Sequence, residues 1–204
     1  MSGAVGPAAE QPESFEFTPE VLAEAEKIIA RYPAGRQQSA VMPLLDLAQR
    51  QHGWLPEVAI RYVADKLGMP FIRAYEVATF YTMYNLAPVG KFHLQLCRTT
   101  PCWLRGADDL RRAIKDRTGL EHSGMTEDGQ FSLVEVECLG ACCNAPMIQI
   151  NDDYYEDLDY DSCVNLLERL AKDDVPTPGP QNGRRFSTPA EGRKTLLQQA
   201  EGTS

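Results

Sequence analysis

Four of the six cysteines fall into two closely spaced pairs, which are the strongest chemical signal in the sequence. Four residues separate Cys97 from Cys102, and three residues separate Cys138 from Cys142. Each pair begins where a predicted strand ends and closes a short loop, so four thiolates could converge from two loops. Such an arrangement suits either a zinc ion or a [2Fe–2S] cluster, and spacing alone favours the two about equally.

The other possible uses of cysteine fit the sequence less well. Residues 1–12 lack the features of a secretory signal or a mitochondrial transit peptide, so we expect a reducing compartment without structural disulfides. A thioredoxin-like redox pair would need Cys-x-x-Cys, which the sequence lacks. Adjacent side chains rarely face the same iron, so we expect Cys143 to be a non-ligand. Cys163 falls in a predicted helix, where a buried structural thiol is expected.

The residues around the two loops also carry information. Pro101 removes one backbone donor and stiffens the first loop, whereas Gly140 permits close backbone approach in the second. Three histidines (His52, His93, His122) are scattered and form no pattern with a nucleophile. No glycine-rich phosphate loop follows a predicted strand, so we expect no nucleotide site on this chain.

Charge and hydropathy narrow the possible partners. The net charge of −9 argues against nucleic acid, which needs a basic face. No apolar run approaches the roughly 20 residues that a transmembrane helix requires. Six carboxylates lie within residues 151–161, which predicts either a solvated edge or a docking face for a basic partner.

Periodicity predicts helices first and strands later. Helical spacing is expected over 19–31, 37–52 and 56–68 and from Pro70 through Tyr84, with Thr18 as the first N-cap and Pro43 as a kink or later start. Alternation predicts strands over 91–97, 131–138 and 145–150, and a short one over 154–158. A helix is expected over 103–117, ending before Gly119, and another from Asp161 to Leu170.

This order of elements predicts an α+β chain. We expect a disordered N-terminus (1–16), a four-helix bundle (17–87), a small α/β domain of thioredoxin type (88–172) and an extended or disordered C-terminal tail (173–204). The tail is rich in Pro, Gly, Gln, Arg and Ser and has no core-forming period.

Several motifs, in order, resemble those of a known family. These are the segments Gln51–Pro56, Tyr75–Asn85, Cys97–Cys102 and Glu137–Pro146. They resemble the small iron–sulfur subunit of the NADH dehydrogenase module of respiratory complex I, from about Phe17 through the final helix. Residues 179–197 also look like the C-terminal extension of the complex I versions of this subunit.

The resemblance implies a thioredoxin-like ferredoxin domain holding one [2Fe–2S] cluster rather than zinc. It implies that the ligands are Cys97, Cys102, Cys138 and Cys142, and that Cys143 stands where relatives commonly have an apolar residue. It further implies an electron-transfer subunit of NADH:quinone oxidoreductase that has no catalytic residue of its own.

The resemblance also implies partners and a location. We expect a hetero-oligomer with the subunit that holds FMN and the NADH site, and with the large iron–sulfur subunit. The expected location is the cytoplasmic side of the bacterial inner membrane, without a membrane span. Similar small subunits serve NAD-linked hydrogenases and formate dehydrogenases, which is the first alternative. A zinc-stapled, non-redox thioredoxin-like module is the second.

Overall fold

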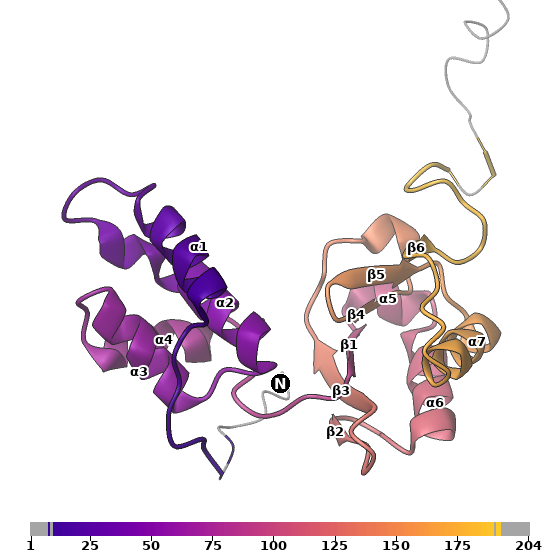
Figure 1. The fold of residues 1–204 in the computed structure, drawn as a ribbon. Helices are drawn as coiled ribbons and strands as arrows, with labels where there is room; N and C mark the ends of the chain where they lie inside the picture. The colour runs from indigo at the N-terminus through magenta and orange to yellow at the C-terminus, as the bar shows by residue number, and fades with distance from the viewer. Residues whose placement is uncertain (1–7, 9, 190, 193–204) are drawn as a thin grey trace, which may run out of the picture. The chain divides into compact units, whose positions relative to one another are not determined.

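The chain forms two compact units that divide between Val89 and Gly90. The computed structural model (Figure 1) describes residues 8, 10–189 and 191–192. The disorder expected for residues 1–7 and 9, and the tail expected at 190 and 193–204, lie outside the described residues. Across the described ranges, no helix combines the length and hydropathy needed to span a bilayer.

Helices make up the first unit. Their bounds are α1 (Pro19–Ile29), the 3₁₀ helix η1 (Gln37–Ala40), α2 (Val41–His52), α3 (Glu57–Lys66) and α4 (Phe71–Phe80). The Thr18 side chain accepts a hydrogen bond from the Val21 N–H, as expected of the N-cap. Pro43 lies in the first turn of α2, so it marks the later start rather than a kink. Gly53 ends α2 with a φ of 91°, a conformation that favours glycine.

A single apolar core holds the helical unit together. Its fully buried members come from all four α-helices, η1 and the segment between α2 and α3, and include Leu44, Leu45, Leu55, Ile60 and Val63. Within residues 10–16, for which disorder was predicted, Phe15 and Gln11 contact this unit. The ring of Phe15 meets those of Phe17 and Tyr62 edge-on, each at 5.6 Å between centroids, and Gln11 accepts the Glu57 N–H. Composition missed this order because two aromatic residues outweigh the polar residues before them.

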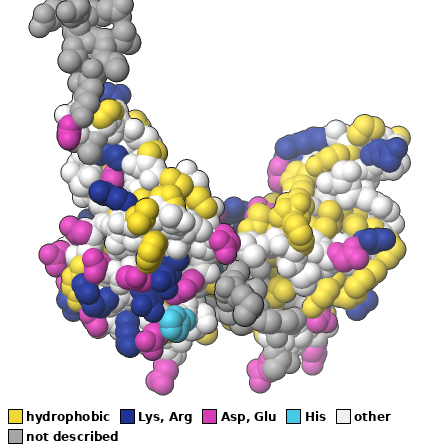
Figure 2. Space-filling view, turned by 180° about the vertical axis from the view of Figure 1, so that it is seen from behind, with side chains coloured by type: hydrophobic (Ala, Val, Ile, Leu, Met, Phe, Trp, Pro, Cys, Tyr) yellow, Lys and Arg dark blue, Asp and Glu magenta, His cyan; other side chains and the backbone are white. Residues whose placement is uncertain are grey.

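The fourth predicted helix is shorter than its apolar spacing suggests. The chain leaves the helical conformation at Tyr81, and Phe80, the last residue of α4, is 77% exposed. Tyr84 is buried beyond the helix end, and its hydroxyl donates to the Met42 carbonyl. Figure 2 shows hydrophobic side chains over much of the visible face of this unit. The larger exposed ones are Ile72, Phe80, Tyr81 and Met83.

The second unit is built on a six-stranded mixed sheet with the order β2-β3-β1-β4-β5-β6. The strands are β1 (Phe92–Cys97), β2 (Gly124–Met125), β3 (Phe131–Val136), β4 (Ile148–Ile150), β5 (Asp153–Glu156) and β6 (Gly179–Pro180). The helices are α5 (Thr100–Leu104), α6 (Ala107–Thr118), the 3₁₀ helix η2 (Cys142–Asn144) and α7 (Tyr160–Leu170). The prediction of a mixed α/β chain is confirmed, whereas the four-helix bundle remains a prediction.

The central strands β1 and β3 run parallel, and β4 pairs antiparallel with the other side of β1. A crossover through α5 and α6 joins β1 to β3, as parallel neighbours require. Helices α6 and α7 lie side by side on one face of the sheet (Figure 1). Alternate β1 residues Phe92, Leu94 and Leu96 enter the core beneath these helices, while His93 and Gln95 are only partly buried.

Two helix boundaries in this unit differ from the prediction. The helix expected over 103–117 is split into α5 and α6 at Gly106, whose φ of 108° is incompatible with helix continuation. The cap of α7 is Asp159 rather than Asp161. Asp159 exchanges hydrogen bonds with Ser162 in a capping box, which satisfies two otherwise unpaired donors.

The start of β1 is held by a tight polar network. A Cβ atom on Gly90 would lie 2.5 Å from the Phe131 carbonyl carbon, so only glycine fits beside β3. The Gly90 N–H donates to the Ser132 hydroxyl oxygen, which lies 2.8 Å from Nδ1 of His93. Because that oxygen already accepts a hydrogen bond, its proton is free to point at an unprotonated Nδ1.

The buried position of His93 makes the free energy of unfolding decrease in mild acid. Burial lowers the pKa of His93 from 6.5 to about 4. Between these values the unfolded chain binds a proton that the folded chain excludes, so the stabilisation is present above pH 6.5 and is lost as the pH falls toward 4. The loss reaches about 3 kcal/mol. We expect His93→Gln to flatten this decline in thermal melts between pH 7 and pH 4.

The exposed His122 provides the matched control, since His122→Gln also removes one imidazole but not a buried one. A decline in stability that is the same in the wild type and in His93→Gln would contradict the assignment.

Candidate metal centre

The parallel pairing of β1 and β3 brings both cysteine loops to one end of the sheet. Cys97 ends β1 and lies opposite Val136, the last residue of β3. Cys102 follows on α5, whereas Cys138 comes two residues after β3 and Cys142 begins η2. The four predicted site residues therefore project from neighbouring strand ends. The structure brings all four into one electrostatically coupled group.

The four thiols divide into a buried pair and an exposed pair. Cys97 and Cys102 are buried and lie within hydrogen-bonding reach of each other, whereas Cys138 and Cys142 are exposed. The Sγ atoms of Cys138 and Cys142 are 3.4 Å apart. Two thiolates on one tetrahedral metal at about 2.3 Å would lie about 3.8 Å apart, so small adjustments would suit a shared metal.

Backbone N–H groups and a hydroxyl point at the sulfurs. The Gly140 N–H donates to Cys138 Sγ at 3.4 Å, and the Leu139 backbone on the second loop lowers the pKa of Cys97 on the first. The Thr99 hydroxyl lies 3.5 Å from Cys97 Sγ and also interacts with Cys138. Hydrogen bonds of this kind stabilise negative charge on sulfur and tune iron–sulfur sites.

In each pair one thiol ionises more readily than the other. Burial disfavours ionisation of Cys97, yet hydrogen bonds from Thr99 and Leu139 outweigh burial and lower its pKa. Burial, followed by the neighbouring Cys97, raises the pKa of Cys102. The Gly140 N–H, followed by the Cys142 thiol, lowers the pKa of Cys138, while its partner's pKa is raised. In each pair the ionisation of one thiol therefore disfavours ionisation of the other, and metal binding would displace the remaining protons.

The donor set fits a two-iron cluster. A [2Fe–2S] cluster takes two thiolates per iron, which matches two pairs of cysteines on two loops. The buried pair, Cys97 and Cys102, belongs to a small apolar cluster with Ala107, Ala145 and Met147, and Leu139, Ala141 and Tyr154 pack against this cluster.

The remaining cysteines and histidines have other partners. The Cys143 thiol is directed to the Asn144 side-chain oxygen at 3.1 Å, and Cys163 is fully buried in α7. His93 contacts Ser132, and His122 lies 3.4 Å from Glu135. His52 packs among aromatic rings of the helical unit. None of these contacts involves the four paired cysteines.

Sequence reasoning missed the contacts that hold the second cysteine loop in place. The Tyr154 hydroxyl donates to the Leu139 carbonyl at 2.8 Å. Burial, followed by proximity to Cys97, raises the pKa of Tyr154. Tyr154 lies within the acidic run of residues 151–161, in which the carboxylates are the more evident feature. Tyr154 and Leu139 are 15 positions apart in the chain, and no local pattern in the sequence indicates this contact.

The chain after α7 returns to hold the same loop. The Arg184 guanidinium forms a 3.0 Å ion pair with Asp157, and both side chains are less than a tenth exposed. Its two terminal nitrogens donate to the Cys143 carbonyl at 3.1 and 2.6 Å. The buried Asn144 donates to Glu156 and to the Phe186 carbonyl. Two carboxylates of the acidic run, Glu156 and Asp157, therefore bind other residues of this chain. The run does not form only a solvated edge.

Comparison with known families decides the class of this site. The sequence profile of the thioredoxin-like [2Fe–2S] ferredoxins matches residues 25–171. The chain belongs to the thioredoxin-like [2Fe–2S] ferredoxin family. Its curated relatives include a subunit of NADH-quinone oxidoreductase from Rickettsia bellii (strain RML369-C) and its counterpart from Rickettsia conorii (strain ATCC VR-613 / Malish 7). Each is 56% identical over 161 residues, which cover 78% of this chain and 96% of the relative.

Solved structures show the same fold at lower sequence identity. An NAD+-reducing [NiFe]-hydrogenase in the H2-reduced state superposes with a TM-score of 0.56 at 18% identity. The match covers 65% of this chain and 22% of the hydrogenase chain, so this ferredoxin corresponds to about a fifth of that protein. The likeness shows the fold alone.

We expect Arg184→Met to destabilise this ferredoxin. The substitution leaves the Asp157 carboxylate buried without its cation, which costs about 3 kcal/mol. The free energy of unfolding should fall by that amount, and trypsin should cleave at Arg185 faster. Arg185→Met is the matched control for stability, because Arg185 is exposed, and it should change stability by no more than about 0.5 kcal/mol. Equal effects of the two variants on stability would rule out the proposed role of Arg184.

Proposed function

We propose that this ferredoxin is the electron-transfer subunit of an NADH:quinone oxidoreductase, with Cys97, Cys102, Cys138 and Cys142 holding one [2Fe–2S] cluster. The observation that carries the proposal is the pairing of four thiols at the shared end of β1 and β3. The family fits that donor set, and the relatives at 56% identity are named as subunits of that complex.

The pairing of the thiols suggests how the ligands divide. We assign Cys97 and Cys102 to one iron and Cys138 and Cys142 to the other, because each pair is already in contact. When bound, the cluster accepts and returns single electrons. The N–H groups of Leu139 and Gly140 stabilise the negative charge on the sulfurs, and the buried pair keeps water from one side.

The exposed pair indicates where electrons enter and leave. Cys138 and Cys142 are exposed, whereas Cys97 and Cys102 are not, so the surface around the second loop offers the shortest route to a redox partner. Trp103 and Leu104 are also exposed immediately after Cys102, on a surface beside the buried pair. A docked subunit would cover both and exclude water from the exchange.

The binding of NADH and FMN belongs to partner subunits in this proposal. We propose a hetero-oligomer with an FMN- and NADH-binding subunit and with a large iron–sulfur subunit. FMN and NADH would bind only to the partner, since no glycine-rich phosphate loop occurs in this sequence. The proposed location is the cytoplasmic side of the bacterial inner membrane, peripheral to it. We also propose that helices α1 to α4 form a four-helix bundle.

A second candidate is the equivalent small subunit of an NAD-linked hydrogenase or formate dehydrogenase. The fold shared with an NAD+-reducing hydrogenase favours it. The identity of 56% with the NADH-quinone oxidoreductase relatives, against 18% with the hydrogenase, weighs toward the first function. Purification of the tagged chain from its host separates the two. A flavin-containing NADH:quinone oxidoreductase is the expected assembly, and nickel with hydrogenase activity would overturn it.

The ligand assignment predicts two classes of cysteine variant. Alanine at any of Cys97, Cys102, Cys138 or Cys142 removes a thiolate and should lose or degrade the cluster, measured by iron and sulfide content and by visible absorption. Cys143→Ala and Cys163→Ala are matched controls that should keep it, because both thiols have other surroundings.

Two outcomes would contradict this assignment. An intact visible spectrum in Cys138→Ala would show that the ligand set is wrong. A colourless wild-type protein that contains stoichiometric zinc and no sulfide would instead support the zinc-stapled module.

A further inference from the structure

One peptide group links Tyr154 to the exposed cysteine pair. The Leu139 carbonyl and the Gly140 N–H belong to the same planar unit. Its oxygen accepts the Tyr154 hydroxyl at 2.8 Å, and its N–H donates to Cys138 Sγ at 3.4 Å. A hydrogen bond to the carbonyl end of a peptide strengthens donation from its N–H end, because chains of hydrogen bonds polarise one another.

We propose that Tyr154 is a positioning residue that raises the reduction potential of the cluster through the Leu139–Gly140 peptide. Reduction adds one negative charge to a site whose thiolates are already negative. A more polarised N–H stabilises that added charge at Cys138 more than it stabilises the oxidised site. The Tyr154 hydroxyl dipole acts in the same direction, since its proton points at the peptide that carries the donor. This proposal rests on the ligand set proposed above.

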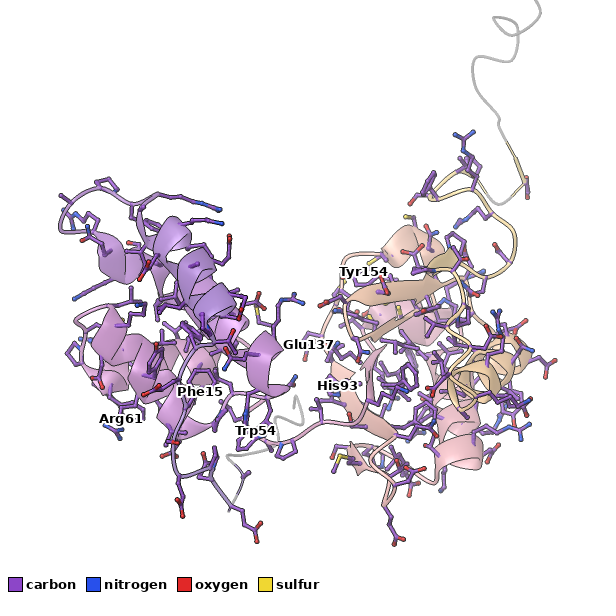
Figure 3. All side chains as sticks on the ribbon, in the orientation of Figure 1. Phe15, Trp54, Arg61, His93, Glu137 and Tyr154 are labelled. Carbon is purple, nitrogen blue, oxygen red and sulfur yellow. The ribbon has the colours of Figure 1, made fainter. Side chains whose placement is uncertain are left out.

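The position of Tyr154 suits this role. It lies on β5, opposite Gln149 of β4, so the sheet fixes its backbone. Its ring packs against the small apolar cluster around Cys97 and Cys102. Figure 3 shows Tyr154 toward the end of the sheet where the cysteine loops emerge, with His93 farther toward the other end. The hydroxyl keeps its proton near neutral pH, because the ordinary pKa of tyrosine is about 10.

Through Leu139, the hydrogen bond from Tyr154 affects both cysteine loops. The Leu139 backbone lowers the pKa of Cys97 on the first loop, and its carbonyl accepts the hydrogen bond from Tyr154. A glycine with a φ of 86° follows, so this backbone lacks the restraint that a side chain at position 140 would impose. Tyr154 therefore restrains a peptide that would otherwise be free to rotate away from Cys138.

The neighbouring tyrosine is a matched control. Tyr155 lies on the same strand but points into the main core, where its hydroxyl donates to the Pro176 carbonyl at 3.1 Å. Tyr154→Phe and Tyr155→Phe each remove one hydroxyl and one hydrogen bond to a carbonyl. Only Tyr154→Phe removes a hydrogen bond to a peptide group whose N–H donates to a cysteine sulfur.

The test is a potentiometric titration with dithionite of the full-length chain carrying its cluster, followed by electron paramagnetic resonance. For Tyr154→Phe we expect a more negative midpoint potential. The reduced-to-oxidised ratio at a fixed ambient potential should fall two- to tenfold, and tenfold corresponds to about 59 mV for one electron. Tyr155→Phe should match the wild type. Altered g values in Tyr154→Phe alone would further support the link.

Two results would overturn the proposal while leaving the proposed function intact. One is a wild-type potential in Tyr154→Phe with the cluster fully loaded. The other is a more positive potential, because that shift indicates a loosened loop that admits water to the charged site. If the wild-type chain holds no [2Fe–2S] cluster, the proposed function itself fails, which iron and sulfide analysis detects before any titration.

A second variant keeps the proposal testable if Tyr154→Phe cannot hold its cluster. Incorporation of 3-fluorotyrosine at position 154 preserves the shape of the ring and makes the hydroxyl a stronger donor. The midpoint potential at pH 7 should then become more positive than that of the wild type. An unchanged potential in this variant would overturn the proposal.

Discussion

The site depends on the parallel register between β1 and β3, which places Cys97 beside Val136. Because the two strands run in the same direction, both end at one edge of the sheet, and the loops that follow them meet there. A hairpin between the same strands would send the loops to opposite ends and separate the cysteine pairs. The crossover through α5 and α6 therefore has two functions, since it makes the pairing parallel and places Cys102 beside Cys97.

The negative charge of the thiolates is balanced by neutral donors rather than by a cation. Arg98 is the cationic residue next to Cys97, but its guanidinium pairs with Glu135 and Asp108. The backbone N–H groups of the second loop and the Thr99 hydroxyl remain as the groups that stabilise charge on sulfur. Such donors are effective only while the loop keeps its shape. The contacts that hold this loop therefore influence the redox chemistry as much as the fold.

The sequence predicted the cysteine pairs because ligands in a loop show a local spacing, but it did not predict the contacts that support them. Arg184 lies in a segment whose composition suggested an unstructured tail, yet it forms an ion pair with Asp157. Tyr154 acts on a loop that precedes it by several residues. Both roles depend on contacts between distant segments, which periodicity and composition do not encode. The fourth helix shows the opposite error, because its apolar spacing predicted a helix through Tyr84 and the helix ends at Phe80.

In the hairpin of β4 and β5, consecutive residues face two different clusters of buried side chains. Tyr154 faces the cysteine loops, Tyr155 faces the main core, and the turn at Asn151 sets which residue faces which side. Inserting or deleting one residue in β5 would exchange the two faces, because side chains alternate along a strand. A change in the length of this strand therefore keeps both tyrosines on their present faces only if it adds or removes an even number of residues. The distance along the chain from the turn to Tyr154 is thus constrained more tightly than the identity of the residues between them.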